Sequence, residues 1–138
     1  MEREVIAELI KSALEARKKA YAPFSDFQVG AAVLTNDGRI YTGCNIENAS
    51  YGATICAERV AIFKAVSEGK KKLEAIAVAG GKCNQEITEY AYPCGICRQV
   101  MGEFADPAAF WVIVAQTMDT YEIYTLADLM PHGFAALE

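Results

Sequence analysis

Cysteines stand at two places in this chain where their spacing suits metal binding. Cys94 and Cys97 form a C-x-x-C motif, and Pro93 before it favours a helix start that puts both thiols on one face of a first turn. The motif alone is compatible with a redox pair, half of a structural zinc site or part of a catalytic site. A redox pair needs no third cysteine, and Cys56 offers one at the start of another helix-like segment. The three thiols together indicate a metal site.

A carboxylate accompanies the third thiol. Glu58 lies two positions after Cys56 in an otherwise apolar segment, and in a first turn both side chains can lean beyond the helix N-terminus. Three thiolates on Zn²⁺ leave one tetrahedral position for water, which is the pattern of a catalytic zinc site. Zinc lowers the pKa of bound water to about 7 in favourable sites, and a nearby carboxylate can carry protons between that water and a substrate.

A closed structural zinc site is the alternative interpretation. Its fourth ligand would be Cys44 or Cys83, and Glu58 would be a solvated helix residue. Arg59 has two interpretations as well. A guanidinium that donates to a sulfur would offset part of the −1 charge that three thiolates give Zn²⁺, whereas a surface Arg59 would pair with Glu58 or Glu103.

Apolar periodicity and turn residues predict the elements that position these side chains. Helices are predicted over residues 3–19, 54–68 and 94–104, with a short last helix opened by Thr125. Strands are predicted over residues 27–34, 39–46, 73–79, 110–115 and 121–124. This order predicts an α/β fold of three layers (α/β/α), in which a mixed five-stranded sheet is covered on both faces by helices. The helix over residues 54–68 is apolar nearly all round, so we expect it to be buried on several sides and to need a partner.

Length, composition and charge limit the class of protein. With 138 residues, 53% of them hydrophobic and 22% charged, the chain is expected to form a single domain over residues 1–138 with a filled core. No apolar run is long enough for a membrane span and no signal-peptide pattern is seen, so we expect a cytoplasmic protein without disulfides and without a membrane partner. The net charge of −5 disfavours a nucleic-acid partner. The sole histidine, His132, limits any histidine-dependent triad to that one residue.

Five ordered blocks of the sequence resemble the small, homotetrameric cytidine deaminases along essentially the whole chain. The blocks span residues 20–32, 43–49, 56–59, 93–99 and 129–134. Cys56-Ala57-Glu58, followed by the Pro93 to Cys97 motif, matches the zinc deaminase pattern with cysteine in place of its histidine ligand. The chain departs from the family at Phe24, where many relatives have tyrosine, and in the longer, more polar segment over residues 82–92, which leaves the fine substrate preference open.

The resemblance implies a metal and a substrate for the chain. One Zn²⁺ per chain would be held by Cys56, Cys94 and Cys97, and Glu58 would move protons at N3 and at the departing amino group. The implied activity is hydrolytic deamination of cytidine and 2′-deoxycytidine to uridine and 2′-deoxyuridine, with ammonia released, in pyrimidine salvage. The implied assembly is a homotetramer with shared active sites.

The resemblance also implies substrate-binding residues. They are Phe27 near the base, Asn45, Ile46 and Glu47 at the ribose, Ala57 at the base edge, and Phe134 over the base bound by a neighbouring subunit. Arg59 and Gln99 fall where the family uses donors to the zinc thiolates. Without the resemblance, Asn45 and Glu47 alternate on a strand and could face a diol or solvent, and Phe27 and Phe134 could be core or interface aromatics.

Three alternatives to this function are open from the sequence. A deaminase of a modified cytosine nucleoside, such as a blasticidin-type antibiotic, would not need Asn45 and Glu47 as a ribose clamp. A nucleic-acid cytosine deaminase would need to overcome the charge of −5. A zinc-binding interaction module would close its metal to water and turn over no nucleoside.

Overall fold

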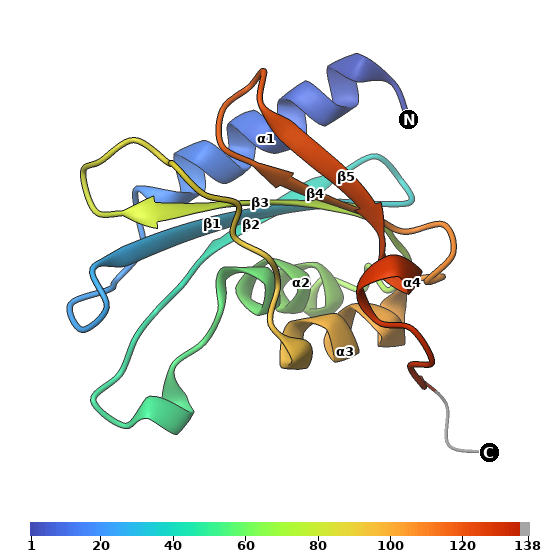
Figure 1. Ribbon diagram of the computed structural model, residues 1–138. Coiled ribbons are helices and arrows are strands. Elements are labelled where there is room, and N and C mark those ends of the chain that lie inside the picture. The colour runs from blue at the N-terminus through green and yellow to red at the C-terminus, as the bar shows by residue number, and fades with distance from the viewer. Residues whose placement is uncertain (136–138) are drawn as a thin grey trace.

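The computed structural model describes residues 1–135 and has a mixed sheet of five strands between two layers of helices (Figure 1). The strands lie in the order β2-β1-β3-β4-β5. Their bounds are β1 Phe27–Thr35, β2 Ile40–Cys44, β3 Leu73–Lys82, β4 Trp111–Ala115 and β5 Tyr121–Thr125. β3 and β4 are parallel, and the other neighbouring pairs are antiparallel. The predicted α/β/α fold with a mixed five-stranded sheet is confirmed.

Helices cover the two faces of the sheet. α1 (Arg3–Arg17) lies on one face, and α2 (Ala57–Ser67) and α3 (Gly95–Phe104) lie on the other (Figure 1). A short last helix, α4 (Leu126–Leu129), follows β5. Thr125 begins α4 with a reciprocal capping box with Asp128, as its place in the sequence predicted.

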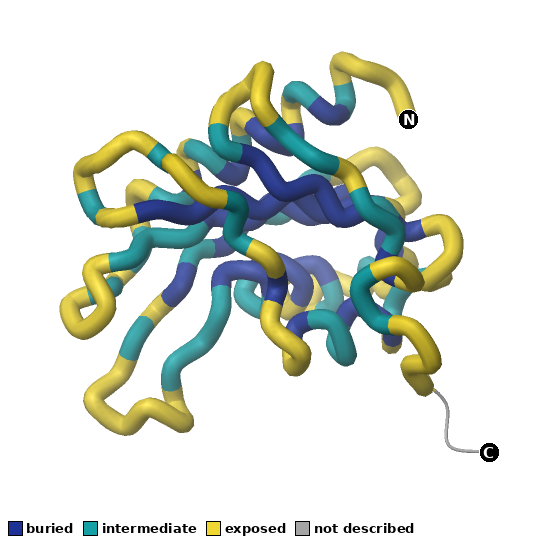
Figure 2. Tube along the Cα trace, in the orientation of Figure 1, coloured by how far each residue is buried: buried dark blue, intermediate teal, exposed yellow. Residues whose placement is uncertain are grey.

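The period of two along the central strands divides the core into two clusters. On β3, Ile76 and Val78 pack toward α2 and α3, whereas Ala75 and Ala77 pack toward α1. The side toward α1 holds many small residues, so that helix lies close to the sheet. Figure 2 shows the central strands as the most deeply buried part of the chain.

The first turn of α2 is pressed against β2 at Gly43. A Cβ atom at Gly43 would stand 2.5 Å from the Ala57 carbonyl oxygen and 2.5 Å from the Ala61 nitrogen. Only a residue without a side chain permits this approach. Glycine at this position therefore fixes where α2 begins relative to the sheet.

Several predicted boundaries differ from the observed ones. α2 begins at Ala57 rather than at residue 54, because Ile55 instead forms a two-way backbone pair with Ile46. β3 continues through Gly80 and Gly81 to Lys82 rather than ending at residue 79, since β1 pairs with it along this length. A single 3-10 turn, Tyr51–Ala53, was not predicted. Within residues 1–135, no helix has the length and apolar character that crossing a bilayer requires.

Within one chain, α2 is not buried on as many sides as predicted. Ala57, Ala61, Ile62 and Ala65 are buried, but Phe63 on the same helix is 44% exposed. Ile96 on α3 is 61% exposed. The layer formed by α2 and α3 therefore presents apolar side chains to its surroundings.

Candidate metal centre and active site

The N-termini of two helices bring three thiols together. Cys56 is the N-cap residue of α2 and Cys94 is the N-cap residue of α3, while Cys97 lies in the first turn of α3. Neither N-cap side chain makes a capping hydrogen bond, so both thiols remain available to a metal. The positive end of each helix dipole favours the thiolate form that a metal requires.

The spacing of the three sulfurs fits a zinc ion. The Sγ atoms of Cys56 and Cys94 are 3.7 Å apart, those of Cys94 and Cys97 are 3.5 Å apart, and all three lie within 4.8 Å of one another. In a tetrahedral site with Zn–S bonds of about 2.3 Å, two ligand sulfurs stand about 3.8 Å apart. Neither Cys44 nor Cys83 joins this cluster among the described residues, so a closed four-cysteine site is not supported.

Arg59 supplies positive charge to the thiol cluster. Its Nη2 atom donates to the Cys56 Sγ atom over 3.5 Å, and its buried Nε atom has no hydrogen-bond partner within residues 1–135. Interaction with the Cys97 thiol, followed by that with Arg59, lowers the pKa of the Cys56 thiol to about 5. The same contact with Cys56 raises the pKa of the Cys97 thiol. Of these two thiols, Cys56 is therefore the one that loses its proton more readily.

Glu58 is a buried carboxyl group in the first turn of α2. It is only 4% exposed, and burial raises its pKa to about 7. A carboxyl group whose pKa lies near neutrality can take up and release a proton under ordinary conditions. Its position next to Cys56 places this capacity beside the metal cluster.

A cavity of about 300 Å³ is lined by Glu58 and by two of the three thiols, Cys56 and Cys94. This volume is at the lower end of the range for small-molecule sites. β1, β3, the segment after β2, the start of α2 and the segment before α3 form its walls. The lining residues are Phe27, Val29, Asn45, Thr54, Ile55, Cys56, Ala57, Glu58, Val78, Ala91, Tyr92 and Cys94. Six of the residues predicted for the site thus surround one space.

Asn45 and Glu47 lie beyond β2, which ends at Cys44 and not at residue 46 as predicted. Asn45 lines the metal-side cavity, where its Nδ2 atom donates to the Phe27 carbonyl oxygen over 2.9 Å and its Oδ1 atom accepts from the Val29 nitrogen over 2.8 Å. This amide therefore fixes the start of β1 beside the cavity.

Glu47 lines an adjoining cavity of about 340 Å³ that shares Thr54 with the first. Its Oε1 atom accepts from the backbone nitrogens of Phe24 and Ser25, 2.9 and 3.1 Å away, and the Ser25 hydroxyl donates to its Oε2 atom. The Ser25 hydrogen bonds lower the pKa of Glu47, with its hydroxyl the largest cause. Asn45 and Glu47 thus line two adjoining cavities.

Three other predicted residues lie outside the metal-side cavity of their own chain. Ile46 is 45% exposed and pairs through its backbone with Ile55. Phe134 is 64% exposed and lines a separate cavity beside Met130. The Nε2 atom of Gln99 donates to the Phe134 carbonyl oxygen over 2.7 Å, so the structure places Gln99 on this backbone group rather than on a thiol.

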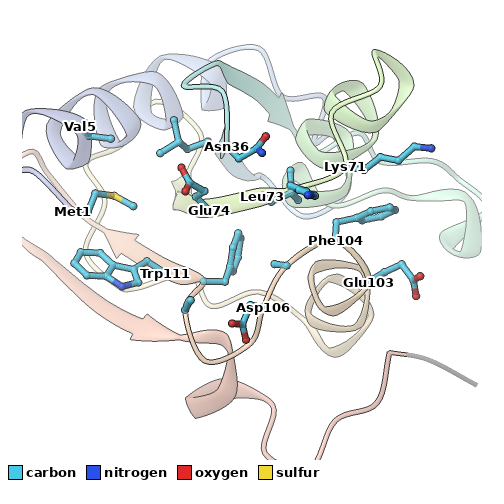
Figure 3. Close-up of a pocket in the computed structure, with 15 residues that line it drawn as sticks. Met1, Val5, Asn36, Lys71, Leu73, Glu74, Glu103, Phe104, Asp106 and Trp111 are labelled. Atoms are coloured by element: carbon cyan, nitrogen blue, oxygen red, sulfur yellow. The ribbon is translucent and has the colours of Figure 1, made fainter. Parts of the chain in front are cut away.

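Tyr92, Ala91 and Thr54 belong to the cavity wall and were not predicted. The sequence offered one signal that Ala91 and Tyr92 belong to the site. They directly precede Pro93-Cys94, and a sequence neighbour of a metal ligand must lie near the metal. A wider cavity of about 860 Å³, lined by residues such as Trp111 and Phe104, lies elsewhere and contains none of the predicted site residues (Figure 3).

A metal site with room for water beside a buried acid–base group is typical of zinc hydrolases. The family described as "Cytidine and deoxycytidylate deaminase zinc-binding region" matches residues 3–113. This match spans all three clustered cysteines, so zinc as the cofactor is confirmed. The chain belongs to the cytidine and deoxycytidylate deaminase family.

Individual relatives extend this similarity over most of the chain. A cytidine deaminase of Halalkalibacterium halodurans is 48% identical over 128 residues, covering 93% of this chain and 92% of the relative. One from Sporosarcina psychrophila is 43% identical, with 94% and 91% covered. The crystal structure of cytidine deaminase from Burkholderia pseudomallei has a TM-score of 0.82 at 45% identity, covering 92% of this chain and 97% of that one.

Proposed function

We propose that this protein hydrolyses cytidine and 2′-deoxycytidine to uridine and 2′-deoxyuridine and releases ammonia. The observation that carries the proposal is the buried Glu58 carboxyl, which lines a cavity of about 300 Å³ together with Cys56 and Cys94, two of the three clustered thiols. Relatives named cytidine deaminase, similar over more than nine tenths of the chain, support it. They do not favour a deaminase of modified nucleosides as the alternative.

The chemistry divides between the metal and Glu58. Cys56, Cys94 and Cys97 would hold Zn²⁺, which supplies the Lewis acid that makes water a nucleophile at neutral pH. Glu58 takes a proton from the attacking water and delivers it to N3 of the pyrimidine. It then carries the second proton of that water to the amino group leaving C4, so that water and the nucleoside give the uracil product and ammonia.

The cavity walls provide for orientation of the nucleoside. The base enters the metal-side cavity beside Phe27, with its edge at the backbone of Ala57 in the first turn of α2. The ribose lies near Thr54, the residue that lines both cavities. Asn45 contacts it from the metal-side cavity and Glu47 from the adjoining one, with Ile46 between these two residues in the chain. The two adjoining cavities support this arrangement, since a nucleoside has two parts to place.

The protein acts, in this proposal, as a homotetramer in which Phe134 covers the base bound by a neighbour. Support comes from Phe63, Ile96 and Phe134, which are 44%, 61% and 64% exposed on the described chain. Exposed apolar side chains on one layer are typical of an interaction surface. Residues 1–138 form a single domain in this proposal, and the enzyme serves pyrimidine salvage in the cytoplasm.

An ultraviolet assay of cytidine conversion, with and without a zinc chelator, tests the activity. We expect cytidine and 2′-deoxycytidine to be converted, activity to be lost with the chelator and activity to return on addition of Zn²⁺. A protein that is loaded with zinc and converts neither nucleoside would contradict the proposal.

A further inference from the structure

The segment over residues 83–94 has no regular secondary structure, yet its last part forms a wall of the metal-side cavity. It connects β3 with α3 (Figure 1) and is largely exposed (Figure 2). Ala91 and Tyr92 line the cavity, and Cys94 follows directly after Pro93. A wall built from an irregular segment needs anchors if it is to keep one shape, because unfixed backbone costs entropy on binding.

The first anchor is the glycine pair at the end of β3. A Cβ atom at Gly80 would stand 3.1 Å from the Ala91 Cβ atom, and one at Gly81 would stand 3.1 Å from the Ile87 Cγ1 atom. The segment thus folds back directly onto the backbone of β3. This contact fixes its middle but leaves the Tyr92 side chain, which is 46% exposed, to be held by other means.

The second anchor is a hydroxyl network with the edge strand β5. The Tyr92 hydroxyl donates to the Glu122 Oε1 atom over 3.1 Å, and the Tyr124 hydroxyl donates to the same oxygen over 2.7 Å. The rings of Tyr92 and Tyr124 meet edge to face, with centroids 5.9 Å apart and an interplanar angle of 65°. An acceptor shared by two hydroxyls holds both rings in one geometry.

We propose that Tyr92 is a positioning residue for nucleoside binding, held at the cavity wall by Glu122 and Tyr124. This inference rests on the proposed function of the same cavity. Glu122 and Tyr124 do not line the cavity, so they act through Tyr92. Loss of the network leaves the thiols and Glu58 in place but frees the wall, so substrate binding weakens while the chemical step is preserved.

The test compares KM and kcat for cytidine in Tyr92→Phe and Glu122→Ala with the wild-type enzyme. We expect each variant to raise KM about 3- to 10-fold, the worth of one hydrogen bond, with kcat changed less than about twofold. The double variant should add nothing further, because both changes break the same network. Glu122→Gln keeps an acceptor oxygen and should recover most of the wild-type KM. Binding of uridine, measured by calorimetry, should weaken in parallel with KM.

Tyr90→Phe is the matched control. It removes a hydroxyl from the same segment, and the Tyr90 hydroxyl makes no hydrogen bond within the described residues, although its ring lies 6.4 Å from that of Tyr92. The inference is overturned if Tyr92→Phe behaves like Tyr90→Phe, if the two effects add, or if zinc content falls with KM unchanged. A wild-type protein that converts no cytidine would instead refute the proposed function.

Discussion

The Nη2 atom of Arg59 lies 3.5 Å from the Sγ atom of Cys56, one helical turn away at the start of α2. No ion pair of Arg59 with Glu58 or Glu103 is present in the described part of the chain. The Arg59 guanidinium therefore interacts with the thiol cluster and not with either carboxylate. A cation held against one sulfur compensates the negative charge that three thiolates bring to a divalent metal.

Arg59→Gln should weaken zinc binding because it removes this compensation. Loss of a partner outside the ligand set typically costs about 10- to 100-fold in metal affinity or activity. Competition with a chromophoric chelator measures the zinc dissociation constant directly. Arg39→Gln is the control, since Arg39 is a largely exposed arginine in the β1–β2 turn. Equal zinc affinities for the two variants would show that Arg59 has no influence on the metal.

Replacing Cys56, Cys94 or Cys97 by alanine should remove the metal. Each variant leaves two sulfurs of the cluster, and the helix N-termini joined by the metal lose that connection, so the melting temperature should fall as well. Metal analysis of the purified proteins gives the zinc content, for which we expect about one per wild-type chain. Cys44→Ala and Cys83→Ala are the controls. Zinc loss from either control would favour the closed four-cysteine site.

Local signals in the sequence predicted the two helices that create the metal centre. Pro93 predicted the start of α3 to within one residue, whereas α2 begins three residues after its predicted start at residue 54. The capping residue Thr125 predicted α4 for the same reason, since a cap acts within one turn.

Pairing between distant segments could not be predicted. Alternation predicted that residues 39–46 form one strand, but β2 ends at Cys44 and Ile46 pairs with Ile55 and Tyr21 instead. A pattern of period two cannot show where a strand leaves its sheet. Tyr92 lies in the cavity wall and its hydroxyl is close to that of Tyr124 on β5, which is 32 positions further along the chain. The sequence contains no local signal for a contact over this separation.

Glu58→Gln should keep the zinc and the fold but lose nearly all turnover. The amide has almost the same shape and cannot take up or return a proton, so we expect kcat to fall by about 10²- to 10⁴-fold. Steady-state kinetics and metal analysis on the same preparation separate the two effects. Retention of a large share of kcat would mean that another group moves the protons.

Gly80→Ala should disturb the cavity through its walls. The added Cβ atom would stand 2.9 Å from the Val29 Cγ2 atom and 3.0 Å from the Phe27 Cε2 atom, and both residues line the cavity. We expect a loss of about 1–3 kcal/mol in the free energy of unfolding, measured in urea, together with a raised KM for cytidine. Gly52→Ala is the matched control because a Cβ atom there has nothing within 4 Å. Equal free energies of unfolding for both variants would mean that Val29 and Phe27 move aside without loss of stability.

Phe134→Ala should raise KM for cytidine about fivefold, the worth of one aromatic contact, without changing zinc content. Phe134 is 64% exposed and does not line the metal-side cavity of its own chain, so the effect requires a neighbouring subunit. Light scattering checks the assembly, for which four chains of 15.0 kDa are expected. A monomer would contradict both the tetramer and the shared site.

Mixing two defective variants tests whether one site takes residues from two chains. When Phe134→Ala chains and Glu58→Gln chains are dissociated and reassembled together, some sites combine an intact Glu58 with an intact Phe134 from the neighbour. Those sites should show the low wild-type KM, although each parent lacks either turnover or tight binding. Reassembly of Phe134→Ala with the double variant Phe134→Ala/Glu58→Gln is the control, because no intact Phe134 is then present and KM must stay high. If the first mixture also keeps only the high KM, Phe134 does not act across the subunit boundary.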